Sequence, residues 1–226
     1  MGTIQLRHIQ KAFNQGAANE FWAVRGVDLD IDLDETTAIV GPSGSGKTTL
    51  LSMIGCLSRP TCGRITLNGE LLSGLPERFM TEIRRRRFGF VFQRFNLISG
   101  LTVLDNVMLP AFPIGPKRRD LKQRAEALLE QFRLSRKSAS KIEWLSGGEA
   151  QRAAICRALI NDPDVLIADE PTANLDTDLS MEFMSMITSL KQAGRGIILS
   201  SHDPLVFDAE VVDRVVRIRD GIISEA

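Results

Sequence analysis

Gly41-Pro42-Ser43-Gly44-Ser45-Gly46-Lys47-Thr48 is the stretch of sequence that decides the fold of this chain. It matches the phosphate-binding loop pattern G-x-x-x-x-G-K-[ST], the P-loop, at every fixed position. An apolar run, 37–40, precedes it and is typical of a buried strand, and a helical run, 49–54, follows it. Strand, loop and helix in this order are the context that the motif requires. A glycine-rich turn without a ligand is the alternative, and agreement over the motif and both flanks argues against it.

The loop predicts a site for the phosphate groups of a nucleotide. Its three glycines lack Cβ atoms, so their backbone can turn several N–H groups toward one point. Those N–H groups and the positive end of the following helix hold phosphate oxygens. Lys47 adds a mobile positive charge for the outer phosphates, and the Thr48 hydroxyl can ligate Mg²⁺. The candidate nucleotide-binding residues here are Gly41, Pro42, Ser43, Gly44, Ser45, Gly46, Lys47, Thr48 and Thr49.

Composition predicts a packed globular protein. The 226 residues are enough for one large domain, or for one domain with an inserted lobe. Hydrophobic residues make up 43% and charged residues 25%, and Lys plus Arg equals Asp plus Glu at 28 each. The balanced charge gives no general attraction to nucleic acid, and we expect no nucleic-acid partner. The sequence contains no run of about 18 apolar residues, the pattern that predicts a membrane span. The first residues lack the pattern of a signal peptide.

Three cysteines, Cys56, Cys62 and Cys156, do not form a metal-binding or redox pattern. Their number is odd and no two of them have C-x-x-C spacing. We interpret them as reduced, small apolar residues of a cytosolic protein.

About the first 40 residues predict an antiparallel β-layer that leads into a parallel core. Apolar and polar residues alternate over 4–13, which suggests an edge strand, and over 22–33, which suggests a second strand. Residues 63–67 form a further strand, and the Asn68-Gly69 pair after it is a strong hairpin signal.

The middle of the chain changes from strand to helix patterns. A helix is expected over 76–87, and it ends in four arginines, 84–87. These arginines either form a solvated helix end that the helix dipole favours, or face lipid headgroups or an acidic partner. Residues 88–92 form an apolar strand. From about 94 to 161 helical patterns dominate, interrupted by the proline-rich connector 110–116. We infer a helical subdomain inserted into an α/β core, within a single domain of residues 1–226.

Polar residues follow three apolar strands of the expected parallel core. Gln93 follows 88–92 and either reaches a ligand or caps the strand. Asp169 and Glu170 end the strand 165–170, where Asp169 can hold Mg²⁺ and Glu170, pointing the other way, can polarise an attacking water. His202 follows the strand 196–200; a lone histidine is often structural, and its position also suits contact with a γ-phosphate.

Two further features have both a structural and a functional interpretation. Ser146-Gly147-Gly148-Glu149 opens a helix as an S-x-x-E capping box. Glycines at a helix start reduce stability, so they also indicate close approach of backbone N–H groups to an anion. Phe13, just before a turn, either packs in the core or stacks on a purine ring.

The ordered set of motifs resembles the nucleotide-binding subunit of ATP-binding-cassette (ABC) transporters, over essentially the whole chain. Leu145-Ser146-Gly147-Gly148-Glu149 matches the family's LSGGE signature. Gln93 matches the Q-loop, 174–176 (Asn-Leu-Asp) the D-loop and His202 the switch histidine. Phe13 matches the aromatic position that stacks on adenine, where tyrosine is more usual. The resemblance implies a RecA-like P-loop NTPase core with an antiparallel β-subdomain and a helical subdomain.

The resemblance also implies a mechanism and its cofactors, ATP and Mg²⁺. Two copies would form a head-to-tail homodimer around two ATP molecules, each held by one P-loop and by residues 146–149 of the other copy. Glu170 would be the catalytic base and His202 would stabilise the γ-phosphate. Lys47 and Gln93 would lie near the γ-phosphate and take part in catalysis. Thr48, Asp169 and Gln93 would serve the metal ion. The partner would be an integral membrane permease, with this chain peripheral on the cytoplasmic face of the inner membrane.

Residues 90–98 and 101–107 look like the MacB/LolD group within that family, which includes FtsE-type systems. Members of that group work with membrane proteins that transmit motion. Two alternatives stay open: a nucleotide-gated scaffold of the FtsE type, and a soluble ABC ATPase acting on nucleic acid or ribosomes. We would expect coiled coils, zinc modules or tandem cassettes in the latter, and this sequence has no such pattern.

Overall fold

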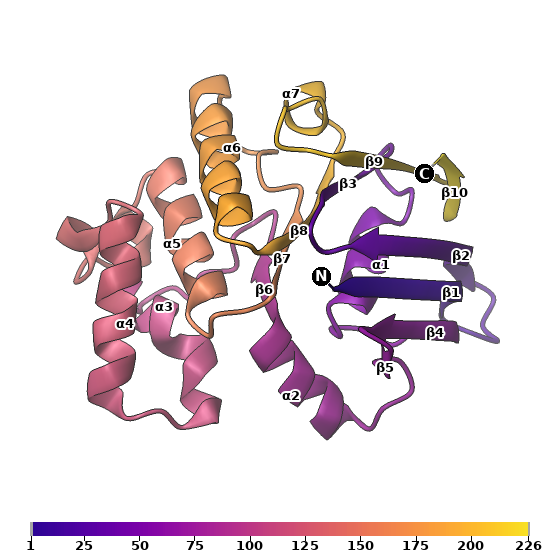
Figure 1. Cartoon of the computed structure of the whole chain (residues 1–226), viewed down its shortest axis with the longest axis horizontal. Coiled ribbons are helices and arrows are strands. Elements are labelled where there is room, and N and C mark those ends of the chain that lie inside the picture. The colour runs from indigo at the N-terminus through magenta and orange to yellow at the C-terminus, as the bar shows by residue number, and fades with distance from the viewer. Residues whose placement is uncertain (1, 226) are drawn as a thin grey trace.

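The computed structural model describes residues 2–225 and, over that range, contains two β-sheets (Figure 1). The core sheet has the strand order β10-β9-β3-β8-β7-β6. Strands β3, β6, β7, β8 and β9 run parallel to their neighbours, and β10 closes the edge as an antiparallel hairpin with β9. Their bounds are β3 Thr36–Val40, β6 Phe88–Val91, β7 Val165–Asp169, β8 Gly196–Ser201, β9 Arg214–Arg219 and β10 Ile222–Glu225.

The core sheet is covered on both faces, which explains why its central strands carry apolar side chains on both faces. In β3, Ala38 and Val40 join one apolar cluster and Ile39 joins the other, on the opposite face. Strand β8 divides in the same way, with Leu199 in the first cluster and Ile198 in the second. Successive side chains of a strand point to opposite faces, so both sets must be apolar when both faces are packed.

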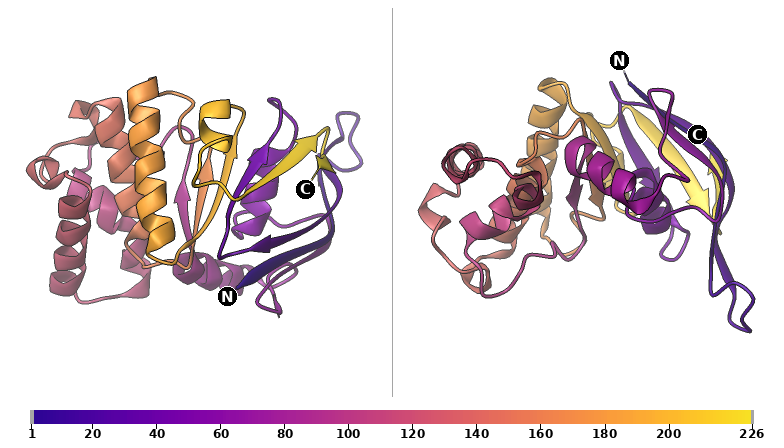
Figure 2. Two further views of the ribbon diagram at one scale, coloured as in Figure 1. Left: turned by 45° about the horizontal axis from the view of Figure 1, so that its top comes forward. Right: turned by 90° about the horizontal axis from the view of Figure 1, so that it is seen from below.

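The second sheet is antiparallel, with the order β2-β1-β4-β5, and forms a separate layer (Figure 2). Its strands are β1 Thr3–Phe13, β2 Phe21–Asp32, β4 Cys62–Leu67 and β5 Glu70–Leu71. The hairpin predicted at Asn68-Gly69 is confirmed: both residues have positive φ, 53° and 81°, as a type I′ turn needs.

The prediction that 4–13 is an edge strand is wrong. Strand β1 pairs with β2 on one side and with β4 on the other, so it lies inside the antiparallel sheet. Alternation of apolar and polar residues reports that one face of a strand is buried. It does not report whether the two backbone edges are paired, and that depends on segments distant in the sequence.

Helix α1 (Lys47–Ile54) packs between the two sheets. It contacts β2 on one side and β7 and β8 on the other. Leu50, Met53 and Ile54 are fully or almost fully buried there, in one cluster with the apolar side chains of the antiparallel sheet. The P-loop therefore sits on a helix fixed from both sides, because the core of the molecule surrounds that helix.

The remaining helices lie mainly on one side of the core sheet (Figure 1). They are α2 Glu77–Arg87, α3 Val103–Met108, α4 Arg118–Gln131, α5 Gly147–Leu159, α6 Thr177–Gln192 and the short α7 Pro204–Phe207. The proline-rich connector is a 3₁₀ helix, η1 (Leu109–Ile114), and two more 3₁₀ turns follow, η2 Ser135–Lys137 and η3 Ile142–Trp144. The predicted α/β fold, with an antiparallel sheet and a helical region between β6 and β7, is confirmed.

Helix α5 joins the helical region to the core sheet. A Cβ atom on Gly89 of β6 would lie 2.4 Å from the carbonyl oxygen of Ala158, so only glycine permits this close approach.

Most of the arginines that end α2 are paired with other groups of the same chain. Arg84 donates to the carbonyl of Cys56, and Arg87 pairs with Asp164 at 2.6 Å. No helix described in residues 2–225 is both long and apolar enough to cross a membrane.

The three cysteines are unpaired and differ in exposure. Cys56 and Cys156 are buried and Cys62 is exposed. Burial raises the pKa of the Cys56 thiol to about 11 and that of Cys156 to about 12, so both stay protonated near neutral pH. We expect a thiolate-selective reagent at pH 7.5 to label Cys62 and to reach the other two only in denaturant. Mass spectrometry of labelled peptides measures this, and rapid native labelling of Cys156 would contradict it.

Candidate nucleotide site at the P-loop

The P-loop connects β3 to α1 and borders a cavity of about 290 Å³. Gly44 and Gly46 have φ angles of 79° and 106°, in the left-handed region that favours glycine. A Cβ atom on Gly46 would also lie 2.5 Å from the carbonyl oxygen of Ala23. The cavity is lined by Phe21, Ala23, Ser43, Gly44, Ser45, Gly46, Lys47, Thr48, Thr49, Gln93, Glu170 and His202.

Lys47 lies at the centre of a buried polar network. Its Nζ donates to the carbonyl oxygens of Gly41, at 2.7 Å, and Pro42, at 3.2 Å. It also pairs with Oε1 of Glu170 at 3.1 Å, and the two side chains are 6% and 11% exposed. The second carboxylate oxygen of Glu170 lies 2.9 Å from Nδ1 of His202. The ammonium group and both carboxylate oxygens are thus satisfied, as buried charges require.

Asp169 sits beside the other end of the motif. Its Oδ1 accepts hydrogen bonds from the hydroxyl of Thr48, at 3.0 Å, and from the hydroxyl of Ser200, at 2.7 Å. Asp169 and Ser200 are register partners in the parallel pair β7–β8, so the sheet itself fixes this contact. A hydroxyl and a carboxylate side by side are the oxygen ligands that Mg²⁺ prefers.

The structure brings Asp169 and Glu170 to neighbouring residues of one loop, Thr48 and Lys47. The expectation that Glu170 simply points the other way is therefore incomplete. Glu170 has a φ angle of 44°, so the strand ends at Asp169 and the alternation of side chains ends with it. The left-handed backbone lets both carboxylates approach the P-loop, an arrangement that strand periodicity does not predict.

Gln93 lies at the mouth of the same cavity, beyond the end of β6. Its backbone carbonyl accepts a hydrogen bond of 3.2 Å from the side chain of Asn174, so two motifs distant in the sequence meet here. His202 contributes its ring from the end of β8, with a side chain that is 64% exposed. Both residues can therefore reach a ligand from the solvent side of the cavity.

The signature segment does not line this cavity. Ser146 caps α5 through a complete capping box with Glu149, as predicted, and its N–H lowers the pKa of the Glu149 carboxyl group. Ser146 and Gly147 are exposed. A Cβ atom on Gly148 would lie 2.6 Å from Leu179, so that glycine has a packing reason. Gly147 has space around it, and its backbone remains open to an external anion.

The aromatic wall of the cavity is Phe21, which the sequence interpretation missed. Phe13 and Phe21 are partners across the β1–β2 ladder and are 43% and 52% exposed. Phe21 lines the cavity, whereas Phe13 is not among the lining residues. The signal for Phe21 in the sequence is an aromatic residue at the start of β2, two residues before Ala23, whose carbonyl oxygen lies close to Gly46 of the P-loop.

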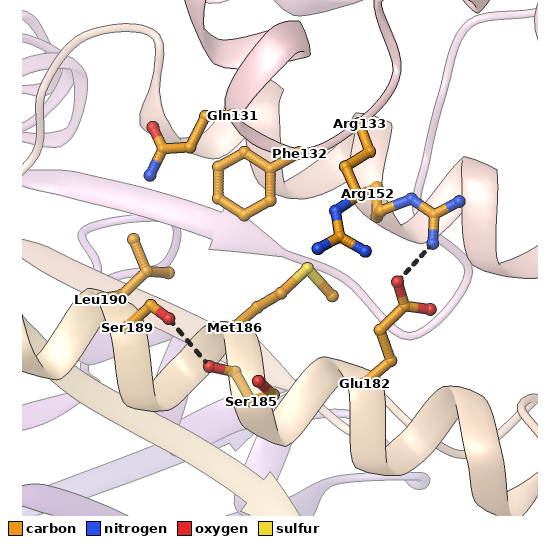
Figure 3. Close-up of a pocket in the computed structure, with 9 residues that line it drawn as sticks. All are labelled: Gln131, Phe132, Arg133, Arg152, Glu182, Ser185, Met186, Ser189 and Leu190. Atoms are coloured by element: carbon orange, nitrogen blue, oxygen red, sulfur yellow. Dashed lines mark hydrogen bonds and ion pairs between the residues drawn. The ribbon is translucent and has the colours of Figure 1, made fainter.

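A second cavity, of about 250 Å³, lies between the end of α4, α5 and α6 (Figure 3). Arg152 of α5 pairs there with Glu182 of α6 at 2.8 Å, which ties the signature helix to the helix that follows β7. None of the predicted nucleotide-site residues lines this cavity, so the P-loop cavity is the candidate site.

Comparison with known proteins identifies the family. The ABC transporter family profile matches residues 24–173. This chain belongs to the ABC transporter family. The ABC transporter ATP-binding protein YknY of Bacillus subtilis is 41% identical over 223 residues, covering 99% of this chain and 96% of YknY. The dimeric ABC transporter cassette MJ0796 has a TM-score of 0.89 at 36% identity, covering 98% of this chain and 97% of that one.

A second structure of MJ0796 and one further relative are also similar to this ABC cassette. A post-hydrolysis state of MJ0796, bound to ADP and Pi, is 35% identical with a TM-score of 0.89. The macrolide export ATP-binding/permease protein MacB of Hyphomonas neptunium is 41% identical and covers 99% of this chain. This chain spans about a third, 34%, of the length of that protein. The predicted resemblance to the ABC ATPases, and to the MacB/LolD group within them, is confirmed.

Proposed function

We propose that this chain is the ATP-hydrolysing cassette of a membrane exporter and works as a pair of copies that share two ATP molecules. The observation that carries the proposal is the position of Glu170, held between Lys47 and His202 in the P-loop cavity. A carboxylate at this place can accept a proton from a water molecule that attacks a bound γ-phosphate.

Each P-loop residue has a defined task in the proposal. The N–H groups of residues 43–49 and the positive end of α1 hold the phosphates. Lys47 exchanges its contacts with Gly41, Pro42 and Glu170 for phosphate oxygens, which releases Glu170 to face water. Gln93 and His202 contact the γ-phosphate side, and Phe13 and Phe21 provide the aromatic surface for adenine.

Magnesium completes the ligand set, and the residues fit it. The Thr48 hydroxyl and the Asp169 carboxylate already meet, and Gln93 adds an amide oxygen from the cavity mouth. No group of three or more His, Cys, Asp or Glu side chains able to hold a metal occurs in the described part of the chain. The pair of Thr48 and Asp169 fits an ion held partly by the triphosphate, because Mg²⁺ in such sites takes one or two protein oxygens plus substrate phosphates and water. The ion, when bound, neutralises charge on the phosphates.

A second copy supplies the part of the site that one copy lacks. Ser146 and Gly147 expose the N-terminus of α5 away from the P-loop cavity of their own chain. An exposed helix N-terminus attracts anions, so we assign it to the γ-phosphate on the other copy's P-loop. The dimeric state of the similar cassette MJ0796 supports this assignment. Cleavage of the γ-phosphate removes the group that joins the two copies, and they separate.

The membrane partner meets a groove between the core and the helical region. The groove, of about 270 Å³, is lined by residues of α2, β6, η1 and α5 and of the segments that follow β6 and α5. Phe90 of β6 and Phe92 just after it line the groove, and their rings stack with centroids 5.6 Å apart. Arg85 borders it, as do Arg84 and Arg157, whose guanidinium groups donate to backbone carbonyls of the chain itself. We propose that a short apolar segment with a carboxylate, from an exporter permease, docks there, as the joint ATP-binding/permease name of MacB suggests. In this proposal the chain works on the cytoplasmic face of the membrane, where ATP is available.

Mixing two inactive variants tests the shared site. Lys47→Met removes the phosphate-binding ammonium, and Gly147→Asp places a carboxylate where the γ-phosphate should approach. We expect each variant alone to hydrolyse ATP at least about a hundredfold more slowly than the native chain. A mixed dimer contains one intact site, built from the P-loop of one variant and the α5 N-terminus of the other. Mixing should therefore restore hydrolysis well above the sum of the separate rates. A mixture that stays additive would contradict sharing, and mixing each variant with itself is the control.

A further inference from the structure

Trp144 is the most exposed large apolar side chain among the described residues, at 70%. It ends the 3₁₀ turn η3 and precedes the helix cap Ser146 by two residues. Isolated exposed apolar residues are common, but an indole left in water next to a ligand-binding helix end requires a reason. Tryptophan is also among the residues most often found at the centre of binding interfaces.

The turn that carries Trp144 is well ordered by hydrogen bonds. The Trp144 N–H donates to the carbonyl of Lys141 at 3.1 Å, and Thr102 and Lys141 form an antiparallel bridge. The N–H of Gly100 donates to the Glu143 carboxylate at 2.6 Å. Backbone N–H groups lower the pKa of Glu143, so this anchor stays ionised at neutral pH. The exposure of Trp144 is therefore a feature of a fixed surface and not of a loose loop.

The purine base of a nucleotide held in the P-loop cavity would be covered by protein on one face. Phe21 lines the cavity, and its cross-strand partner Phe13 lies beside it as a second exposed ring on the adjacent strand. The other described residues that line the cavity are polar, small or belong to the phosphate loop. A purine has two faces available for stacking, so its second face stays in water in a single copy.

We propose that Trp144 of a second copy covers that second face, forming an aromatic clamp on the base of ATP together with Phe13 and Phe21 of the first copy. The proposal rests on the shared site proposed above and extends it from the phosphates to the base. One residue, Leu145, lies between Trp144 and Ser146, so their Cα atoms lie within about 7 Å. When Ser146 of one copy reaches the γ-phosphate, its Trp144 ring is carried onto the same nucleotide.

The clamp makes base stacking part of dimer closure, because each base is gripped only when two copies meet. The clamp predicts that Trp144 stabilises the closed dimer only when the bound triphosphate carries a base, as ATP does. A role in packing against protein predicts stabilisation with any triphosphate. The two origins of the effect are therefore separable by the choice of ligand.

The test uses the full chain with Glu170→Gln, which slows hydrolysis, and Trp22→Phe, which leaves Trp144 as the single tryptophan. With Mg-ATP we expect the Trp144 emission to change as the dimer forms, measured alongside sedimentation. Replacing Trp144 with alanine should weaken ATP-driven dimerisation at least about tenfold, as expected for loss of a base–aromatic stack. With inorganic tripolyphosphate in place of ATP, the alanine variant and its parent should dimerise equally.

A matched control is Phe79→Ala, which removes another exposed aromatic side chain, 46% exposed on α2. It should leave dimerisation unchanged. Equal ATP-driven dimerisation of the Trp144→Ala variant and its parent would overturn the clamp alone. So would a tenfold loss that persists with tripolyphosphate, because that loss would come from protein contacts. If the parent does not dimerise with ATP at all, the shared site fails and the clamp fails with it.

Discussion

A Glu170→Gln variant is expected to bind Mg-ATP, form the dimer and hydrolyse ATP about 10²- to 10⁴-fold more slowly than the native chain. Glutamine keeps the shape of the side chain and can still contact Lys47 and His202, the two partners of the native carboxylate. It cannot accept a proton from water. Single-turnover hydrolysis measures the chemical step, and ATP-dependent sedimentation measures dimerisation.

Two controls define what this result means. Asp208→Asn removes an acidic group just after α7, outside the residues that line the P-loop cavity, and should leave the rate unchanged. His202→Ala should slow hydrolysis less than Glu170→Gln, because His202 contacts Glu170, the proposed general base, and does not itself accept the proton from water. Turnover of the Glu170→Gln variant within a factor of about three of the native rate would remove Glu170 from its role.

The contact between Lys47 and Glu170 gives this prediction a structural basis. In the structure, the Glu170 carboxylate is paired with the Lys47 ammonium group, which we propose also binds the phosphates. Arrival of ATP offers Lys47 a stronger anionic partner, since phosphate oxygens carry more charge than one carboxylate. In the proposed function, the same event would bind the substrate and free Glu170 to act as the catalytic base.

Local patterns in the sequence were enough to predict the P-loop, the strand that ends in Asp169 and the capping box at Ser146. Each depends on residues close in the chain: a loop between a strand and a helix, an apolar run before a carboxylate, an S-x-x-E spacing. The parallel core then brings Asp169 to Thr48 because the carboxyl ends of parallel strands meet at one edge of a sheet.

Features that depend on distant contacts could not be predicted. Strand β1 is an interior strand because it pairs with β4, and the paired residues are about 60 positions apart in the sequence. The packing reason for Gly148 is the side chain of Leu179, on another helix. The approach of Glu170 to Lys47 needs a left-handed residue at the strand end, and no turn motif announces it. Phe21 was missed because the cavity wall is formed by two sheets that meet only in the fold.

Lys47→Met is the change with the second large expected effect, and it acts on stability as well as on ATP binding. Lys47 and Glu170 are both almost fully buried, with side chains 6% and 11% exposed. Removal of the ammonium leaves the Glu170 carboxylate near His202 but without its charged partner. Breaking a buried ion pair from one side is costly, so we expect the free energy of unfolding to fall by about 2–4 kcal/mol. ATP affinity should fall about tenfold to a hundredfold from the lost charged hydrogen bonds.

The double variant Lys47→Met/Glu170→Gln separates the two effects. Glutamine carries no charge, so it does not need the ammonium, and the double variant should regain about 1–3 kcal/mol of the lost stability. ATP affinity should stay low, because the phosphates still lack Lys47. Urea unfolding without nucleotide measures the first quantity, and titration with a fluorescent ATP analogue measures the second. Additive losses of stability in the cycle would mean that Lys47 and Glu170 do not depend on each other in the nucleotide-free chain, and the release of the base by ATP would lose its foundation.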